Sequence, residues 1–334
     1  MIEGTLIFEA KNVNKNFKLN SSFESVLTRF LVGKKTKMVK AVQDLSLAVS
    51  KGETLGIVGE SGCGKSTLAR MMSGIIPASS GEMHYKGNCF NQFLANPREA
   101  LKVQMVFQDP LSSINPRHKV LHIIGEAPVA HGIIKKAQMR DYVVAQLETV
   151  GLSPDYVNRF PHQFSGGQRQ RISIARALAV KPEFLICDEA VAALDVSVQA
   201  QIINLLMDIK RQFDLTVVFI SHDLSVIRHF CNRVLVMYLG RTVEIAKTAE
   251  LFNNPIHPYT RTLIAGMPRI SLHRREFLPI TGEIPSPLNP PSGCAFHTRC
   301  PDKTSECIRQ SPPLVKISKS RSHACLNVRR GINT

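Results

Sequence analysis

The sequence predicts an α/β fold with a parallel sheet, an antiparallel β subdomain, an inserted α-helical lobe and a small cysteine-rich C-terminal extension. Two observations predict the parallel part. The apolar run 54–58 reads as a buried strand and leads into the glycine-rich loop Gly59–Ser66. The apolar runs 184–187 and 216–220 enclose the helical stretch 196–213, which is a β-α-β order. Short β-rich runs of this kind suit strands that are buried on both faces.

The other parts follow from patterns along the chain. Residues 1–50 contain short alternating segments that are typical of antiparallel strands. Residues 66–72 read as the helix after the glycine-rich loop, and mostly helical patterns over 120–160 indicate a separate lobe at about 110–170. Proline and glycine become frequent after about residue 268.

We therefore expect a main domain over residues 1–268 and a Pro-rich, four-cysteine extension over residues 269–334. The extension is too small and loop-rich to rest on a large core of its own.

The 334 residues carry a formal net charge of +16. Such a charge favours an anionic partner, such as nucleic acid, acidic lipid or a phosphate-rich ligand, although an ordinary solvated basic surface explains it as well. No apolar run approaches the ~18 residues that a membrane span needs. Residues 1–4 begin no signal peptide, so we expect the chain to stay in the cytosol.

The glycine-rich loop fits the phosphate-loop pattern G-x-x-x-x-G-K-[ST]. Its glycines allow several amide N–H groups to point inward toward phosphate oxygens, together with the N-terminus of the following helix. Lys65 is expected to reach the β- and γ-phosphates, and the Ser66 hydroxyl to bind Mg²⁺. The predicted nucleotide-binding residues here are Gly59, Glu60, Ser61, Gly62, Cys63, Gly64, Lys65, Ser66 and Thr67.

Two adjacent acids, Asp188 and Glu189, follow the apolar run 184–187. They either cap a strand end or act on a nucleotide, and two buried carboxylates are costly without a purpose. We interpret Asp188 as a partner of Mg²⁺ and Glu189 as the group that polarises an attacking water.

Between loop and acids lies Phe164-Ser165-Gly166-Gly167-Gln168, whose bare glycines and helix N-terminus make a second phosphate-binding surface. With these three motifs, the chain resembles the ATPase subunit of an ABC transporter. The resemblance implies a P-loop (RecA-like) ATPase core that binds ATP and Mg²⁺. It also implies that Ser165, Gly166, Gly167 and Gln168 face the ATP of a partner subunit, and that Ala193-Leu194-Asp195 contacts that partner.

The same resemblance assigns three further residues. Gln108 is implied to contact Mg²⁺ and the attacking water, and His222 to contact the γ-phosphate. Phe17 is the candidate for stacking on adenine, with core packing as the alternative and Phe23, Phe30 and Val39 as rivals. Four positions depart from the family pattern, namely Phe164, Ala190, Val191 and Ala192.

Other segments resemble the oligopeptide/dipeptide branch of ABC importers, and most closely its second ATPase. They are residues 108–110 with 113–117, residues 254–260, and residues 282–287 with 290–294. The resemblance implies a related second ATPase, two membrane permease subunits and an extracytoplasmic peptide-binding protein. It places the chain on the cytoplasmic face of a bacterial inner membrane. A soluble ATPase acting on nucleic acid and an exporter component are the alternatives.

Cys294, Cys300, Cys307 and Cys325 have the spacing C-x5-C-x6-C-x17-C. Disulfides are rare in a reducing cytosol, so a bound metal is the more natural interpretation. Structural zinc sites usually contain C-x2–4-C pairs, which are missing here, and this favours a [4Fe–4S] cluster, as the resemblance also implies. Zinc is the second choice and four unligated thiols the third.

Overall fold

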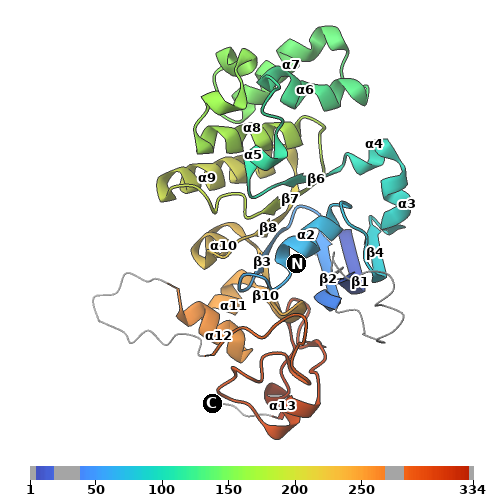
Figure 1. Ribbon diagram of the computed structural model, residues 1–334, viewed down its shortest axis with the longest axis vertical. Helices are drawn as coiled ribbons and strands as arrows, with labels where there is room; N and C mark the ends of the chain where they lie inside the picture. The colour runs from blue at the N-terminus through green and yellow to red at the C-terminus, as the bar shows by residue number, and fades with distance from the viewer. Residues whose placement is uncertain (1–4, 19–37, 268–281, 331–334) are drawn as a thin grey trace, which may run out of the picture.

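The computed structural model describes residues 5–18, 38–267 and 282–330. Within these ranges, no helix is both long and apolar enough to cross a bilayer. Figure 1 shows the helical lobe at the top, the two sheets in the middle and the C-terminal extension at the bottom.

The central sheet has the strand order β11-β12-β10-β9-β3-β8-β7-β6. The strands from β9 to β6 in this order are mutually parallel, and β10 joins β9 antiparallel. Every residue of β3, β7 and β8 is buried, because helices and the second sheet cover both faces. The bounds are β3 Thr54–Val58, β6 Val103–Val106, β7 Phe184–Asp188, β8 Thr216–Ile220, β9 Arg233–Tyr238, β10 Arg241–Lys247, β11 Val315–Lys316 and β12 Ser322–His323.

The predicted antiparallel subdomain is confirmed as a sheet of order β2-β1-β4-β5. Its long strands pair through alternating buried positions such as Phe8, Ala10, Leu45 and Leu47. The bounds are β1 Leu6–Lys18, β2 Met38–Ser50, β4 Ser80–Tyr85 and β5 Asn88–Cys89.

Helices cover the sheets and build the upper lobe (Figure 1). The lobe packs α6, α7 and α8 around Ile124, Val143, Leu147 and Ile174, which are fully buried. The helices are α2 Lys65–Met72, α3 Phe90–Ala95, α4 Pro97–Ala100, α5 Pro110–Ser113, α6 Val120–Ala130, α7 Met139–Thr149, α8 Gly166–Leu178, α9 Val196–Phe213, α10 Leu224–Phe230, α11 Thr248–Asn253, α12 Pro258–Ala265 and α13 Ser305–Arg309. Short 3₁₀ turns span Lys136–Gln138, Pro154–Asn158, Pro161–Gln163 and Asn327–Arg330.

The C-terminal extension packs directly on the main body of the fold. Strand β12 pairs antiparallel with β10, through Glu244 opposite His323, and β11 pairs with β12. Phe296, also in the extension, is 1% exposed and belongs to the main core. The expected boundary at about residue 268 lies outside the described residues, so the division into two domains stays a prediction.

Candidate nucleotide site

The phosphate loop connects the end of β3 to the start of α2. Gly64 caps α2 in a left-handed conformation, with a φ of 104°. A Cβ at this position would lie 2.1 Å from the carbonyl oxygen of Ala41, so only glycine fits between loop and β2. Ser61 is exposed at the tip of the loop, Thr67 is half-buried, and Cys63 is buried with a thiol pKa that burial raises.

Lys65, the first residue of α2, turns back over the loop. Its ammonium is buried and donates to the carbonyl oxygens of Gly59 at 2.8 Å and Glu60 at 3.0 Å. The loop backbone therefore holds this cation beside the amide groups that are expected to receive phosphate oxygens.

Ser66 and Asp188 meet across the gap between α2 and β7. The Ser66 hydroxyl donates to Asp188 Oδ1 at 3.0 Å. Burial raises the pKa of Asp188, and this hydrogen bond opposes the rise by stabilising the carboxylate. A hydroxyl and a carboxylate oxygen side by side are the donor types that Mg²⁺ prefers, so the pair fits the predicted metal role.

Gln108, Glu189 and His222 come from the carboxyl ends of three adjacent strands, β6, β7 and β8. The Gln108 amide donates to Glu189 Oε2 at 3.1 Å, and His222 Nδ1 lies 3.7 Å from the same oxygen. Two of the three predicted catalytic side chains, Gln108 and His222, therefore converge on the carboxylate of the third, Glu189. The arrangement can hold a water between groups that orient it and a base that accepts its proton.

The predicted second phosphate-binding motif lies at the surface of the upper lobe. Ser165 caps α8: its hydroxyl accepts from the Gln168 N–H at 3.4 Å, and Gln168 Oε1 accepts from the Ser165 N–H at 3.1 Å. Ser165 and Gly166 are exposed, and so is Asp195 at the N-terminus of α9. These residues are open to a partner.

The departures from the family pattern are accommodated locally. Phe164 is buried in the lobe and packs edge-to-face on Tyr156, with ring centroids 5.3 Å apart. Ala190 and Val191 are buried and Ala192 is exposed, all directly after Glu189.

Phe17 lies near the end of β1, where it pairs in register with its rival Val39. Its ring is 39% exposed, so it is not part of the core, and the Lys15 ammonium lies 5.2 Å from its centroid. The rivals Phe23 and Phe30 lie outside the described residues.

Tyr259 contacts the phosphate loop and was not predicted from the sequence as a site residue. Its hydroxyl accepts a hydrogen bond from the Glu60 N–H at 2.9 Å, and its side chain is fully buried. The signal was present, because Tyr259 belongs to the peptide-branch segment 254–260, but a motif by itself does not reveal a contact across 199 positions.

The four C-terminal cysteines lie within one small segment, and all four are free thiols, buried or half-buried. Among the residues that the structure describes, no group of three or more His, Cys, Asp or Glu side chains is arranged to hold a metal ion. Burial raises the pKa of Cys294, and it raises that of Cys300 to about 12. The Cys307 thiol lies 3.3 Å from the Thr304 hydroxyl. The predicted [4Fe–4S] cluster, and zinc as its alternative, stay predictions.

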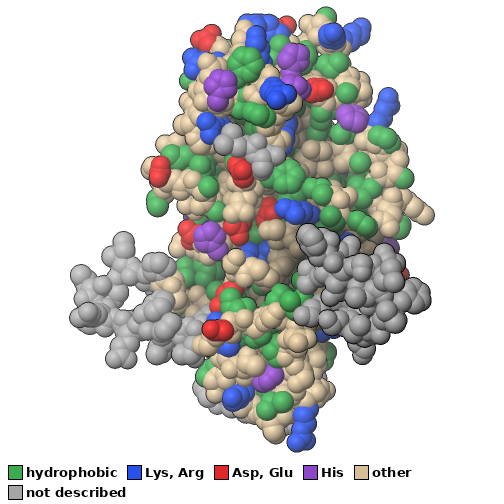
Figure 2. All heavy atoms as spheres, in the orientation of Figure 1, with side chains coloured by type: hydrophobic (Ala, Val, Ile, Leu, Met, Phe, Trp, Pro, Cys, Tyr) green, Lys and Arg blue, Asp and Glu red, His purple; other side chains and the backbone are tan. Residues whose placement is uncertain are grey.

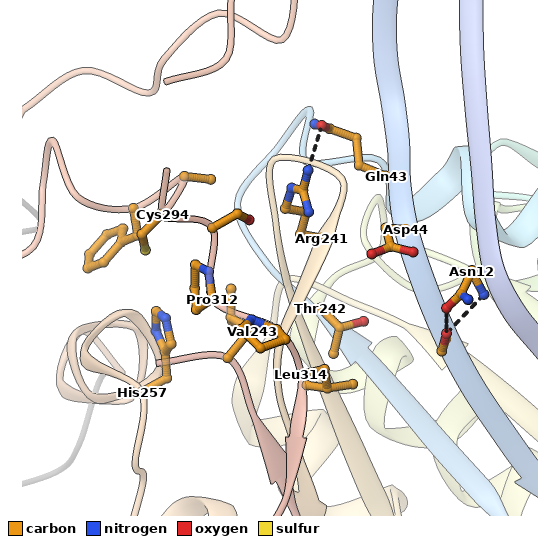
Figure 3. Close-up of a pocket in the computed structure, with 16 residues that line it drawn as sticks. Asn12, Gln43, Asp44, Arg241, Thr242, Val243, His257, Cys294, Pro312 and Leu314 are labelled. Carbon is orange, nitrogen blue, oxygen red and sulfur yellow. Dashed lines mark hydrogen bonds between the residues drawn. The ribbon is translucent and has the colours of Figure 1, made fainter. Parts of the chain in front are cut away.

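A pocket of about 290 Å³ lies where the antiparallel sheet, β10 and the extension meet (Figure 3). Arg241 donates across it to Gln43 Oε1 at 3.3 Å, and Cys294 reaches its wall. No residue of the phosphate loop lines this pocket, so it is separate from the nucleotide site.

Comparisons with known proteins identify the family. The family described as ABC transporter matches residues 42–192, and the oligopeptide/dipeptide transporter C-terminal region matches residues 243–307. The oligopeptide transport ATP-binding protein OppF of Haemophilus influenzae is 44% identical, covering 97% of each chain. The dipeptide transport ATP-binding protein DppF of the same organism is 45% identical, covering 88% of this chain and 91% of the relative.

Among solved structures, the dimeric post-hydrolysis state of the ATP-binding cassette MJ0796, bound to ADP and Pi, aligns with a TM-score of 0.61 at 27% identity. The alignment covers 72% of this chain and 99% of that one.

Fold and site together define an ABC-type ATPase that binds and hydrolyses ATP. More narrowly, the chain belongs to the oligopeptide/dipeptide branch of the ABC transporter ATPases. The comparisons do not support the nucleic-acid alternative.

On the face shown in Figure 2, Lys and Arg side chains are interspersed with acidic and apolar ones.

Proposed function

We propose that this chain is the ATP-hydrolysing, energy-coupling subunit of an importer for dipeptides or oligopeptides. One observation carries the proposal: the likeness to ATPases named for peptide transport extends through the C-terminal extension as well as the ATPase body. We expect no peptide-binding residue in this chain.

The residues divide the chemistry as follows. Lys65 and the loop amides bind the β- and γ-phosphates of ATP, with Phe17 against the adenine. Ser66, Asp188 and Gln108 would hold Mg²⁺, which would neutralise charge on the phosphates when bound. Glu189 accepts the proton of the attacking water, while Gln108 orients that water and His222 contacts the γ-phosphate.

The chain works as half of a pair. Ser165, Gly166, Gly167 and Gln168 bind the ATP held by a related second ATPase, and Asp195 contacts that partner. The exposure of Ser165, Gly166 and Asp195 supports this arrangement. The upper lobe receives two membrane permease subunits on the cytoplasmic face of a bacterial inner membrane, and an extracytoplasmic binding protein delivers the peptide from the other side.

The C-terminal cysteines hold a [4Fe–4S] cluster in this proposal. Four thiols within one small segment supply the ligand type that such clusters take. Iron and acid-labile sulfide analysis of anaerobically purified protein tests it: about four of each per chain is expected, whereas zinc without sulfide would assign the site to zinc.

Co-purification from mildly solubilised membranes tests the transport assignment. The tagged chain is expected to retain two polytopic permeases and a second, similar ATPase, identified by mass spectrometry. Recovery only in the soluble fraction, with nucleic acid or ribosomes attached, would overturn the assignment and leave the ATP site standing.

A further inference from the structure

The C-terminal extension reaches into the phosphate loop through one side chain. Arg299 makes a bidentate ion pair with Glu60, with Nη1 2.7 Å from Oε2 and Nη2 3.0 Å from Oε1. The Arg299 side chain is only 4% exposed. Two parallel hydrogen bonds of this kind fix both distance and orientation, which a single contact does not.

Arg299 is itself held in place by aromatic packing. Its backbone N–H donates to the Phe296 carbonyl at 3.0 Å, and Nη1 donates to the Tyr238 hydroxyl at 3.4 Å. Phe296 packs edge-to-face on Tyr238, with centroids 5.2 Å apart, and also contacts Tyr259. The guanidinium is therefore presented to Glu60 by a buried, rigid support.

Glu60 transmits this contact to the phosphate-binding groups. Its N–H is bound by the Tyr259 hydroxyl, and its carbonyl oxygen accepts from the Lys65 ammonium at 3.0 Å. Glu60, which Arg299 holds, is thus one of the two residues whose carbonyl oxygens bind the Lys65 ammonium, the other being Gly59. A shift of Glu60 would move the Lys65 ammonium with it.

The Arg299–Glu60 ion pair also changes the charge of the phosphate loop. A carboxylate in a loop that wraps a triphosphate repels its own ligand, and in a partly buried site that repulsion is poorly screened. Arg299 supplies the matching positive charge, and Glu60 is the one acid of the loop.

We propose that Arg299 is a positioning residue of the ATP site: through Glu60 it fixes the phosphate loop and cancels the carboxylate charge there, so that the extension sets the affinity for ATP. The inference rests on the nucleotide site proposed above. It goes beyond that site because it assigns a role in nucleotide binding to a residue of the extension.

A second buried ion pair provides a matched control. Arg321, also in the extension, lies 3.0 Å from Glu244 of β10, with side chains 12% and 0% exposed. This pair also joins the extension to the ATPase body but touches no phosphate-loop residue. Arg321→Met removes a comparable docking contact and leaves Glu60 paired.

The test is titration of the purified full-length chain with a fluorescent ATP analogue and Mg²⁺, after circular dichroism has confirmed folding. Arg299→Met is expected to weaken binding about tenfold, equivalent to about 1.4 kcal/mol. Adding Glu60→Gln to Arg299→Met is expected to recover most of that loss, because the unpaired charge is gone. Arg321→Met is expected to lower the melting temperature without weakening binding.

Three results would overturn the inference: Arg299→Met binding within twofold of wild type, a double variant as weak as Arg299→Met, or an equal loss in Arg321→Met. If Arg299→Met does not fold, Arg299→Lys keeps the charge but loses the planar fork that binds both carboxylate oxygens of Glu60. A loss of two- to fourfold then supports the inference, and unchanged binding contradicts it. Wild-type protein that binds no nucleotide would instead refute the proposed site itself.

Discussion

Glu189 occupies a left-handed backbone conformation, with a φ of 48°. Such a conformation costs a residue other than glycine about 1–3 kcal/mol, so its surroundings must hold it. Its N–H donates to the Ile220 carbonyl of β8 at 3.0 Å. The turn directs the carboxylate toward Gln108 and His222. In the proposed function, this carboxylate accepts the proton of the attacking water.

Glu189→Gln is therefore expected to lower ATP turnover by about two to four orders of magnitude, the usual contribution of a general base. The amide retains the shape of the carboxylate, so nucleotide binding should remain. Phosphate release and nucleotide affinity, measured on the same preparation, separate the two effects. Unchanged turnover would remove Glu189 from the mechanism.

The burial of His257 makes the free energy of unfolding depend on pH. His257 is 2% exposed, and its Nδ1 accepts from the Tyr259 N–H at 3.1 Å at the start of α12. Burial, followed by the nearby His323, lowers the pKa of His257 to about 3. An unfolded histidine titrates near 6.5, so the unfolded chain binds one proton more between these values.

The contribution of His257 to the free energy of unfolding is therefore fully present above about pH 6.5 and is lost as pH falls toward 3. The loss is at most about 1.4 kcal/mol per pH unit. His257→Asn keeps an acceptor for the helix cap but does not titrate. The variant is expected to lose less stability than wild type between pH 7.5 and 5.5, in paired thermal melts. An equal loss in both proteins would contradict this account.

At the scale of elements, the phosphate loop is shaped by what packs against its glycines. Gly62 and Gly64 both have positive φ, but a Cβ on Gly62 meets nothing within 4 Å, whereas one on Gly64 meets Ala41 backbone at 2.1 Å. We expect Gly62→Ala to cost about 1–2 kcal/mol of conformational strain. Gly64→Ala should cost more than about 3 kcal/mol, because it also displaces β2. Denaturant unfolding of both variants compares them, and equal losses would argue against the packing explanation.

The elements nearest the site were predictable because their sequence signals are local. The strands over 54–58 and 216–220 and the helix over 196–213 have the predicted bounds, since each is a continuous apolar run or a long helical pattern. Strands β11 and β12 have two residues each, too few for any periodicity, and exist because β10 offers an edge.

The candidate catalytic residues could be named from the sequence, because Glu189 follows a buried apolar run and the family resemblance assigns Gln108 and His222. The side chains that support the phosphate loop could not be named. Gln108, Glu189 and His222 each follow an apolar strand, and adjacent parallel strands bring their carboxyl ends together. Tyr259 and Arg299 reach Glu60 across 199 and 239 positions. Neither the motif that contains Tyr259 nor a single arginine in the proline-rich extension indicates which distant residue the side chain contacts.

At the scale of the whole molecule, the phosphate loop and the Ser165 motif serve two different nucleotides if the chain works in pairs. Ser165→Arg places a bulky cation where the partner's ATP is expected. In a Glu189→Gln background with ATP, this change should abolish pairing with the second ATPase in size-exclusion chromatography. Ser153→Arg is the control, because Ser153 also caps a turn of the upper lobe, through the Asp155 N–H at 3.3 Å. Pairing that survives Ser165→Arg would contradict the head-to-tail arrangement.

ATP hydrolysis by the complete transporter in liposomes tests the central claim most directly. The chain would be reconstituted with its co-purifying membrane subunits and second ATPase, with peptide-loaded binding protein added on the opposite side. We expect hydrolysis to rise with loaded binding protein and to fall sharply in Glu189→Gln. Hydrolysis that is indifferent to peptide and membrane subunits, yet stimulated by nucleic acid, would contradict the account.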